Sequence, residues 1–231
     1  MQSTAKPYAV LSSSVLKIIA IVTMFIDHFG YAIVYWSDQK IPYYQLCRDI
    51  GRIAFPLYCF MLVEGFYHTR SRPRYAGNML AFAILSEIPF NLFIGARLRL
   101  PDYQNVFFTL LLGLLAIWAM EKIREKHILL MVFPAALGMA AAYLLHTDYD
   151  FKGVLLIIVL YLLRSRPALR FVCAALCLYW EWKAIFALIP ISLYNEKRGW
   201  MKGPVVKYFF YIFYPAHLLA LAWLRARLFG I

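Results

Sequence analysis

Long apolar segments recur along the whole of this chain, and they restrict its fold more than any other feature. Hydrophobic residues make up 63% of the 231 residues and charged residues only 16%, whereas soluble domains are about half apolar and about a quarter charged. A helix that crosses a bilayer needs about 20 mainly apolar residues. One such segment could be a buried helix of a soluble protein, but a repeated series is typical of a membrane protein.

The sequence therefore predicts an all-α, polytopic transmembrane helix bundle in one domain over residues 1–231, with about nine spans (range eight to ten). The expected spans cover residues 15–36, 50–67, 75–95, 105–120, 128–146, 151–163, 168–180, 183–194 and 205–224. The three between 151 and 194 are short for a hydrocarbon core of ~30 Å. They must tilt little, thin the bilayer locally, or include a hairpin that does not fully cross.

The positive charges suggest an orientation for this bundle. If the N-terminus is cytoplasmic, most of the 24 lysines and arginines fall in cytoplasmic segments, and most acidic loop residues fall on the other side. This is the bias that the positive-inside rule describes. We therefore expect an N-terminus in the cytoplasm and a multi-pass protein of the inner (cytoplasmic) membrane, in contact with membrane lipid.

Several other classes of protein are disfavoured. The net charge of +12 could indicate nucleic-acid binding, but that requires a basic face on a soluble domain, and the sequence has no such domain. The four cysteines lack metal-ligand spacing, so we expect them to pack in the protein and we expect no metal. Walker, dinucleotide-binding and HExxH signatures are absent.

A few ionisable residues lie inside the expected spans. A charged side chain in mid-membrane costs roughly 2.5–3.5 kcal/mol on insertion scales, so such residues are candidates for a functional site. They are Asp27, His28, Arg52, Glu64, Glu87 and His217.

Depth along the helices brings part of this set together. At ~1.5 Å per residue, Asp27, Glu87 and His217 lie at similar depths, slightly outward of the midplane. Prolines near Arg52, Glu87 and His217 interrupt backbone hydrogen bonding, which lipid tolerates only beside protein or a wet cavity. We therefore expect a central wet cavity, to which Asn105 contributes a hydrogen-bonding side chain.

Asp27 and His28 together suit general-base chemistry, because a carboxylate can fix the tautomer of a neighbouring imidazole. Adjacent residues on a helix point about 100° apart, so the carboxylate partner of His28 is either Asp27 or Glu87. His217 is the alternative base. An ion-paired scaffold, such as Arg52 with Glu87 or Asp27, is the competing structural interpretation.

Six segments, in order along nearly the whole chain, resemble the TraX family of F-pilin acetylases. They are residues 17–30 (KIIAIVTMFIDHFG), 51–56 (GRIAFP), 64–69 (EGFYHT), 86–90 (SEIPF), 105–110 (NVFFTL) and 208–218 (YFFYIFYPAHL). Each segment alone is weak, but the combination is specific. The sequence departs from the family pattern at Glu196, where we expect glycine.

The resemblance implies an integral membrane acyltransferase that moves an acetyl group from cytoplasmic acetyl-CoA to an acceptor. The acceptor would be a protein N-terminal amine, such as that of pilin, or a surface glycan or small molecule. His28 or His217 would be the base, Asp27 or Glu87 would orient it, and Arg52 or Asn105 would stabilise the oxyanion. The expected donor-binding residues are Glu64, Arg70, Arg72, Arg74, Lys197 and Arg198.

Two other functions remain open at this point. A proton- or substrate-coupled transporter could use Asp27, Glu64 and Glu87 as a relay. A catalytically inert assembly factor would need the same residues only for folding. A homodimer is one possible assembly, and the sequence does not determine the oligomeric state.

Overall fold

The computed structural model describes residues 9–37, 41–124 and 127–230, and this part of the chain is helical apart from loops and two isolated bridges. The α-helices are α1 (Ser13–Ala32), α2 (Ile41–Gly51), α3 (Ala54–His68), α4 (Arg72–Gly95), α5 (Val106–Arg124), α6 (Val132–Leu144), α7 (Asp150–Leu162), α8 (Pro167–Cys177), α9 (Leu188–Ser192) and α10 (Pro204–Phe229). Three 3₁₀ segments accompany them: η1 (Val34–Trp36), η2 (Ile128–Met131) and η3 (Tyr179–Ala187). The predicted all-α class is confirmed for the described residues.

Four segments of the described chain are long and apolar enough to cross a membrane: Ser13–Trp36, Arg72–Gly95, Val106–Arg124 and Pro204–Phe229. The other expected spans correspond to shorter helices. The expected span 183–194 is divided between η3 and the five-residue α9, which is too short to cross on its own. The count of about nine spans and the side of the N-terminus stay predictions.

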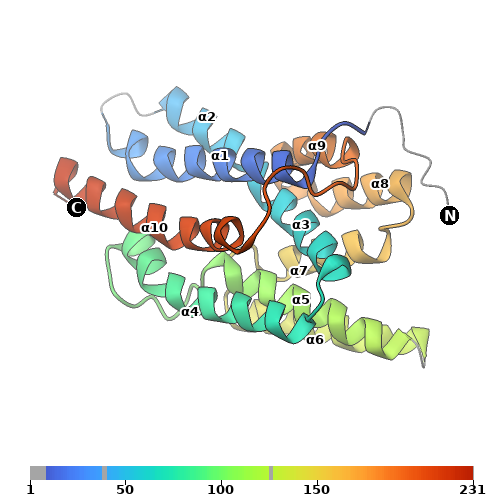
Figure 1. Ribbon diagram of the computed structural model, residues 1–231. Coiled ribbons are helices and arrows are strands. Elements are labelled where there is room, and N and C mark those ends of the chain that lie inside the picture. Colours follow the sequence, from blue (N-terminus) through green and yellow to red (C-terminus); the bar gives the residue numbers. More distant parts are fainter. Residues whose placement is uncertain (1–8, 38–40, 125–126, 231) are drawn as a thin grey trace.

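The long helices lie roughly alongside one another, with the start of α1 and the end of α10 at opposite ends of the bundle (Figure 1). α10 runs between α1 and α4 and packs on both (Figure 1). α5, α6 and α7 pack together beside α4, and α3 crosses the interior against α1, α5 and α7. α3 is accordingly the helix whose apolar side chains, such as Phe60, Val63 and Phe66, are most completely buried.

The outside of the bundle is apolar. Large side chains on α4 (Ile84, Leu85, Ile88) and α6 (Phe133, Leu137) are each more than half exposed. Exposed apolar surface on this scale is unfavourable in water and is what a lipid-facing helix presents. Burial therefore agrees with hydropathy that this is a membrane protein.

The loop before α10 contains the position at which the sequence departs from the family pattern. Glu196 has a φ of 62°, in the left-handed region that glycine adopts readily and other residues adopt at a cost of roughly 1–2 kcal/mol. The expected glycine thus has a local conformational reason. Gly199, with a φ of 80°, lies in the same loop.

Candidate functional site

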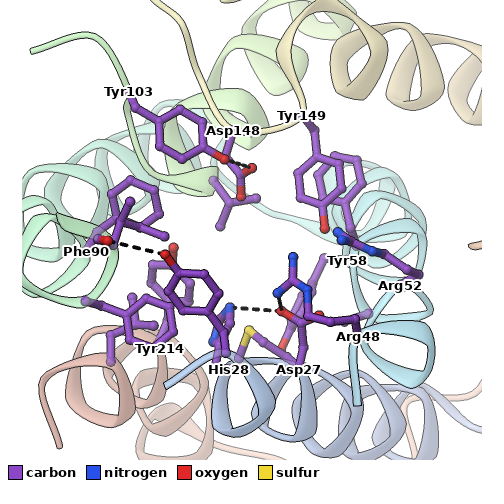
Figure 2. A pocket seen from close by; sticks show the side chains of 18 residues that line it. Asp27, His28, Arg48, Arg52, Tyr58, Phe90, Tyr103, Asp148, Tyr149 and Tyr214 are labelled. Atoms are coloured by element: carbon purple, nitrogen blue, oxygen red, sulfur yellow. Dashed lines mark hydrogen bonds and ion pairs between the residues drawn. The ribbon is translucent and has the colours of Figure 1, made fainter. Parts of the chain in front are cut away.

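A small cavity of about 150 Å³ lies between α1, α2, α3, α4 and the loop before α7. Figure 2 shows Asp27 and His28 on one side of it, Arg48 and Arg52 beside them, and Tyr103, Asp148 and Tyr149 opposite. Ionisable and aromatic side chains therefore converge on one cavity, which Asp27, His28 and Arg52 of the expected intramembrane set line. We call it the small cavity.

Asp27 is tied to the helix that follows it. Its Oδ2 atom accepts a hydrogen bond from Arg48 Nη1 at 2.7 Å, while its Oδ1 atom is buried without a partner among the described residues. α1 and α2 approach closely at this point, because a Cβ added to Gly51 would lie 2.2 Å from the Asp27 Cβ. The glycine thus allows α2 to bring Arg48 onto the intramembrane carboxylate.

His28 contacts His217, the other candidate base. Its Nδ1 atom lies 2.6 Å from His217 Nε2, and the two rings stack with centroids 4.9 Å apart. His217 Nδ1 in turn lies 2.6 Å from the carbonyl oxygen of Phe213. The similar depth inferred for these residues therefore corresponds to a direct contact in the fold.

This chain of contacts assigns the tautomers of both neutral rings. A carbonyl oxygen only accepts, so His217 must carry its proton on Nδ1. Its Nε2 atom is then an acceptor, and His28 must donate from Nδ1. The lone pair of His28 is left on Nε2, which lies 3.9 Å from Asp27 Oδ2. His28 lines the small cavity, whereas His217 lines neither cavity described here.

Ion pairs and hydrogen bonds surround the rest of the small cavity. Arg52 Nε lies 3.2 Å from Glu181 Oε2, a residue of η3. The scaffold interpretation had proposed Glu87 or Asp27 as its carboxylate partner. Tyr103 donates to Asp148 Oδ1 at 2.7 Å. Burial raises the pKa of Asp148, against the opposing effects of Tyr103 and Arg52. The wall facing His28 therefore carries a carboxyl group that can bind an acceptor's polar hydrogen.

A large cavity of about 640 Å³ lies between α1, α3, α4, α5, α10 and the loop before α10. The charged and titratable residues lining it are Lys17, Glu64, His68, Arg70, Arg74, Glu196 and Arg198, and aromatic residues including Tyr75, Tyr194 and Phe210 line the remainder. Cations outnumber carboxylates there, so the cavity suits an anion. We call it the large cavity.

The two cavities meet. Met24, Tyr58, Val106 and Tyr214 line both of them. These four side chains therefore form a thin wall between a basic chamber and the chamber that contains His28.

The expected donor-binding residues divide into two groups. Glu64, Arg70, Arg74 and Arg198 line the large cavity, but Arg72 and Lys197 do not. Arg72 instead lies 3.5 Å from Glu121 and 4.2 Å from the centre of the Phe66 ring. Its position in the first turn of α4 directs it toward α5 rather than toward its neighbours in the sequence.

Glu64 already has a cationic partner. Arg164 Nε and Nη2 donate to its two carboxylate oxygens at 2.8 and 3.0 Å, a bidentate geometry. His68 lies 3.6 Å away on the next turn of α3. Glu64 therefore links α3 to the end of α7, which leaves it a poor ligand for a polyanion.

Glu87 and Asn105 form a contact of their own. Asn105 Nδ2 donates to Glu87 Oε2 at 2.5 Å and to the Ala83 carbonyl at 2.8 Å, and Asn105 Oδ1 accepts from the Phe107 backbone. Neither residue lines the small cavity. Both side chains are engaged in joining α4 to the start of α5, and the structure does not bring them to the small cavity beside His28.

Sequence reasoning missed several residues at the two cavities. Lys17 lines the large cavity, and Arg48, Asp148 and Tyr149 line the small one, but none of them is among the site residues expected from the sequence. The available signal was indirect: a buried intramembrane carboxylate such as Asp27 needs a cation, and Arg48 is the next arginine along the chain.

Comparison with known proteins agrees with the resemblance seen in the motifs. A model of the family described as TraX protein matches residues 12–225. A curated relative, the probable fimbrial assembly protein FimC, serogroup H1, from Dichelobacter nodosus, is 32% identical over 234 residues, which cover 89% of this chain and 92% of the relative. No solved structure matches this chain. The motifs and the match over nearly the full length show that the chain belongs to the TraX protein family.

Proposed function

We propose that this protein is an acetyl-CoA-dependent acetyltransferase of the inner membrane, with its N-terminus in the cytoplasm. The observation that carries the proposal is the pair of adjoining cavities, one basic and large, the other small and containing His28. A polyanionic donor fits the first, and a reacting acyl group fits the second. The fimbrial relative's name supports an acceptor that belongs to surface appendages, such as a pilin-like protein.

Acetyl-CoA would bind with its phosphates among the cations of the large cavity. Its narrow pantetheine arm would pass the wall formed by Met24, Tyr58, Val106 and Tyr214. The thioester would then lie in the small cavity beside His28. In this arrangement the charged end stays in the basic chamber, and only the acyl end approaches the membrane interior.

Transfer proceeds in one displacement. His28 Nε2 takes a proton from the acceptor amine or hydroxyl, and the acceptor atom attacks the thioester carbonyl carbon. The new C–N or C–O bond forms, the C–S bond breaks, and His28 returns the proton to the departing thiolate. Throughout, His217 Nε2 accepts a hydrogen bond from His28 Nδ1–H. Arg48 or Arg52 stabilises the oxyanion as negative charge develops on the carbonyl oxygen.

The purified protein in lipid nanodiscs should release free CoA from acetyl-CoA in a time-dependent way, faster when an acceptor amine or hydroxyl is present. A thiol reagent measures the CoA, and labelled acetyl groups report transfer. Matched nanodiscs without protein give the background rate. Flux of a solute across liposomes with no CoA release would instead favour the transporter. If the protein showed neither flux nor CoA release, the result would favour the assembly factor.

Removing cations from the large cavity should weaken donor binding without changing chemistry. Replacing Arg70, Arg74 and Arg198 together with glutamine should raise the KM for acetyl-CoA more than tenfold, since charge-assisted contacts to phosphates contribute about 1.5–3 kcal/mol each. The kcat at saturating donor should stay near that of the wild type.

The matched control replaces Arg97 and Arg99, exposed arginines in the loop after α4 that line neither cavity. That variant should keep the wild-type KM. Equal KM values for the two variants would show that the large cavity does not bind the donor's phosphates.

A further inference from the structure

Arg225 is a buried cation whose partner is the end of a helix. Only 3% of it is exposed. Its Nη1 atom donates to the Phe93 carbonyl at 2.8 Å and its Nη2 atom to the Leu92 carbonyl at 3.0 Å. Within the described residues its guanidinium thus binds backbone oxygens of α4 and no carboxylate. It follows directly after the expected span 205–224, yet it lies inside α10.

This contact has a clear electrostatic basis. The last carbonyls of a helix carry the negative end of the helix dipole. The Phe93 and Leu92 carbonyls lie in the last turn of α4, where the Leu92 oxygen also accepts from the Ala96 backbone N–H at 3.1 Å. A buried cation without such a partner would cost several kcal/mol. Arg225 has such a partner through Nη1 and Nη2, while its Nε is buried without a partner among the described residues, and the two contacts join α10 to the end of α4.

The end of α4 also contacts the catalytic histidine. The ring of Phe93, whose carbonyl Arg225 holds, packs edge-on against His28 with centroids 5.1 Å apart. Tyr31, on α1, donates to the Ile94 carbonyl at 3.3 Å and packs against the same phenylalanine. α1 and α10, which carry His28 and His217, are thus both attached to one helix end.

α10 lacks a backbone hydrogen bond near His217. Pro215 lies inside the helix and removes a backbone hydrogen bond just before that residue. Arg225 follows His217 by eight residues, about 12 Å along the helix. A clamp at that distance sets the rotation and height of α10, and hence the place of His217 Nε2.

We propose that Arg225 is a positioning residue for acetyl transfer. By holding the end of α4 to α10, it keeps His217 and Phe93 where they fix His28 as the Nδ1–H tautomer, with its lone pair in the small cavity. The expected loss of kcat rests on the proposed function. The expected change in the tautomer of His28 does not depend on any activity.

The test compares Arg225→Met and Arg225→Lys with Arg227→Met, a control at an exposed arginine on the same helix. Arg225→Met should lower kcat about 10- to 100-fold, the scale of a small displacement at a reacting centre, and leave the KM for acetyl-CoA unchanged. Arg225→Lys keeps the charge but not the two-pronged geometry, so it should fall between Met and wild type. Arg227→Met should match wild type.

A double-variant cycle separates positioning from a general loss of stability. If Arg225 acts through His217, then Arg225→Met should have little further effect in a His217→Ala background. If the double variant lost kcat by the product of the two single losses, the two residues would act independently and the proposal would be overturned. So would a wild-type kcat in a folded Arg225→Met protein, or failure of both Arg225 variants to fold.

Imidazole ¹⁵N spectra of histidine-labelled protein give a readout without turnover. The chain has five histidines, and His28→Gln identifies the His28 signals. Wild-type His28 should show the Nδ1–H pattern, and Arg225→Met should shift it toward a mixture of tautomers. An unchanged pattern would overturn the proposal. If the wild type turns over no acetyl-CoA, the proposed function fails, while this spectrum still decides the role of Arg225.

Discussion

His28→Gln should abolish acetyl-CoA-dependent transfer, with kcat lower by about 10²–10⁴-fold, the contribution typical of a positioned general base. The reason is the hydrogen-bond chain from the Phe213 carbonyl through His217 to His28. It leaves His28 Nε2 as the lone pair that faces the small cavity, and glutamine has no comparable base. CoA release and acetyl incorporation measure the loss.

The stability of this variant should stay close to that of the wild type, because glutamine can replace the Nδ1–H donor to His217. The matched control is His127→Gln, at an exposed histidine before η2, which should retain full activity. A folded His28→Gln protein that transfers acetyl groups at the wild-type rate would exclude His28 as the base and return attention to His217.

Glu64→Gln should produce the largest loss of stability among single changes at the two cavities. Glu64 is 7% exposed and binds Arg164 through both oxygens, so the change leaves a cation without its partner. Breaking a buried pair costs about 3–5 kcal/mol. Because the Arg164 side chain is 32% exposed, we expect about 2–3 kcal/mol, or a Tm lower by roughly 5–10 °C.

Thermal unfolding in detergent, followed by tryptophan fluorescence, measures this effect. Arg164→Gln should destabilise similarly, whereas Arg166→Gln, at an exposed arginine two residues away, should not. Replacing both Glu64 and Arg164 with leucine should recover part of the loss, since no unpaired charge then remains. An unchanged Tm in Glu64→Gln would mean that the pair contributes little, and Glu64 would again be a candidate for donor binding.

The class of protein and the layer of the site could be predicted from the sequence because both depend on local properties. Apolar segments identify membrane helices whatever their packing. An ionisable residue such as Asp27 or His28 inside one of them is expensive wherever the helix lies. Counting residues along a helix also gives depth, which is why His28 and His217, far apart in the chain, could be assigned to similar levels.

Partners could not be predicted in the same way. Depth does not specify which way a side chain points, and the contact between two helices depends on rotation and on where they approach. Glu87 has the right depth for His28 but faces Asn105. Arg48 and Arg164 pair with buried carboxylates of other helices, and Arg225 binds backbone carbonyls at the end of α4, yet none of the three lies inside an expected span.

The sequence by itself thus determined that this chain is a helical membrane protein of the TraX family, with a layer of polar residues in its interior. Only the tertiary structure decided that His28 and His217 form a pair with assigned proton positions, that Arg48 rather than Arg52 pairs with Asp27, and that two cavities adjoin. The physical reason is that apolar content and depth are properties of a single helix. Hydrogen bonds, ion pairs and cavities are properties of how helices pack.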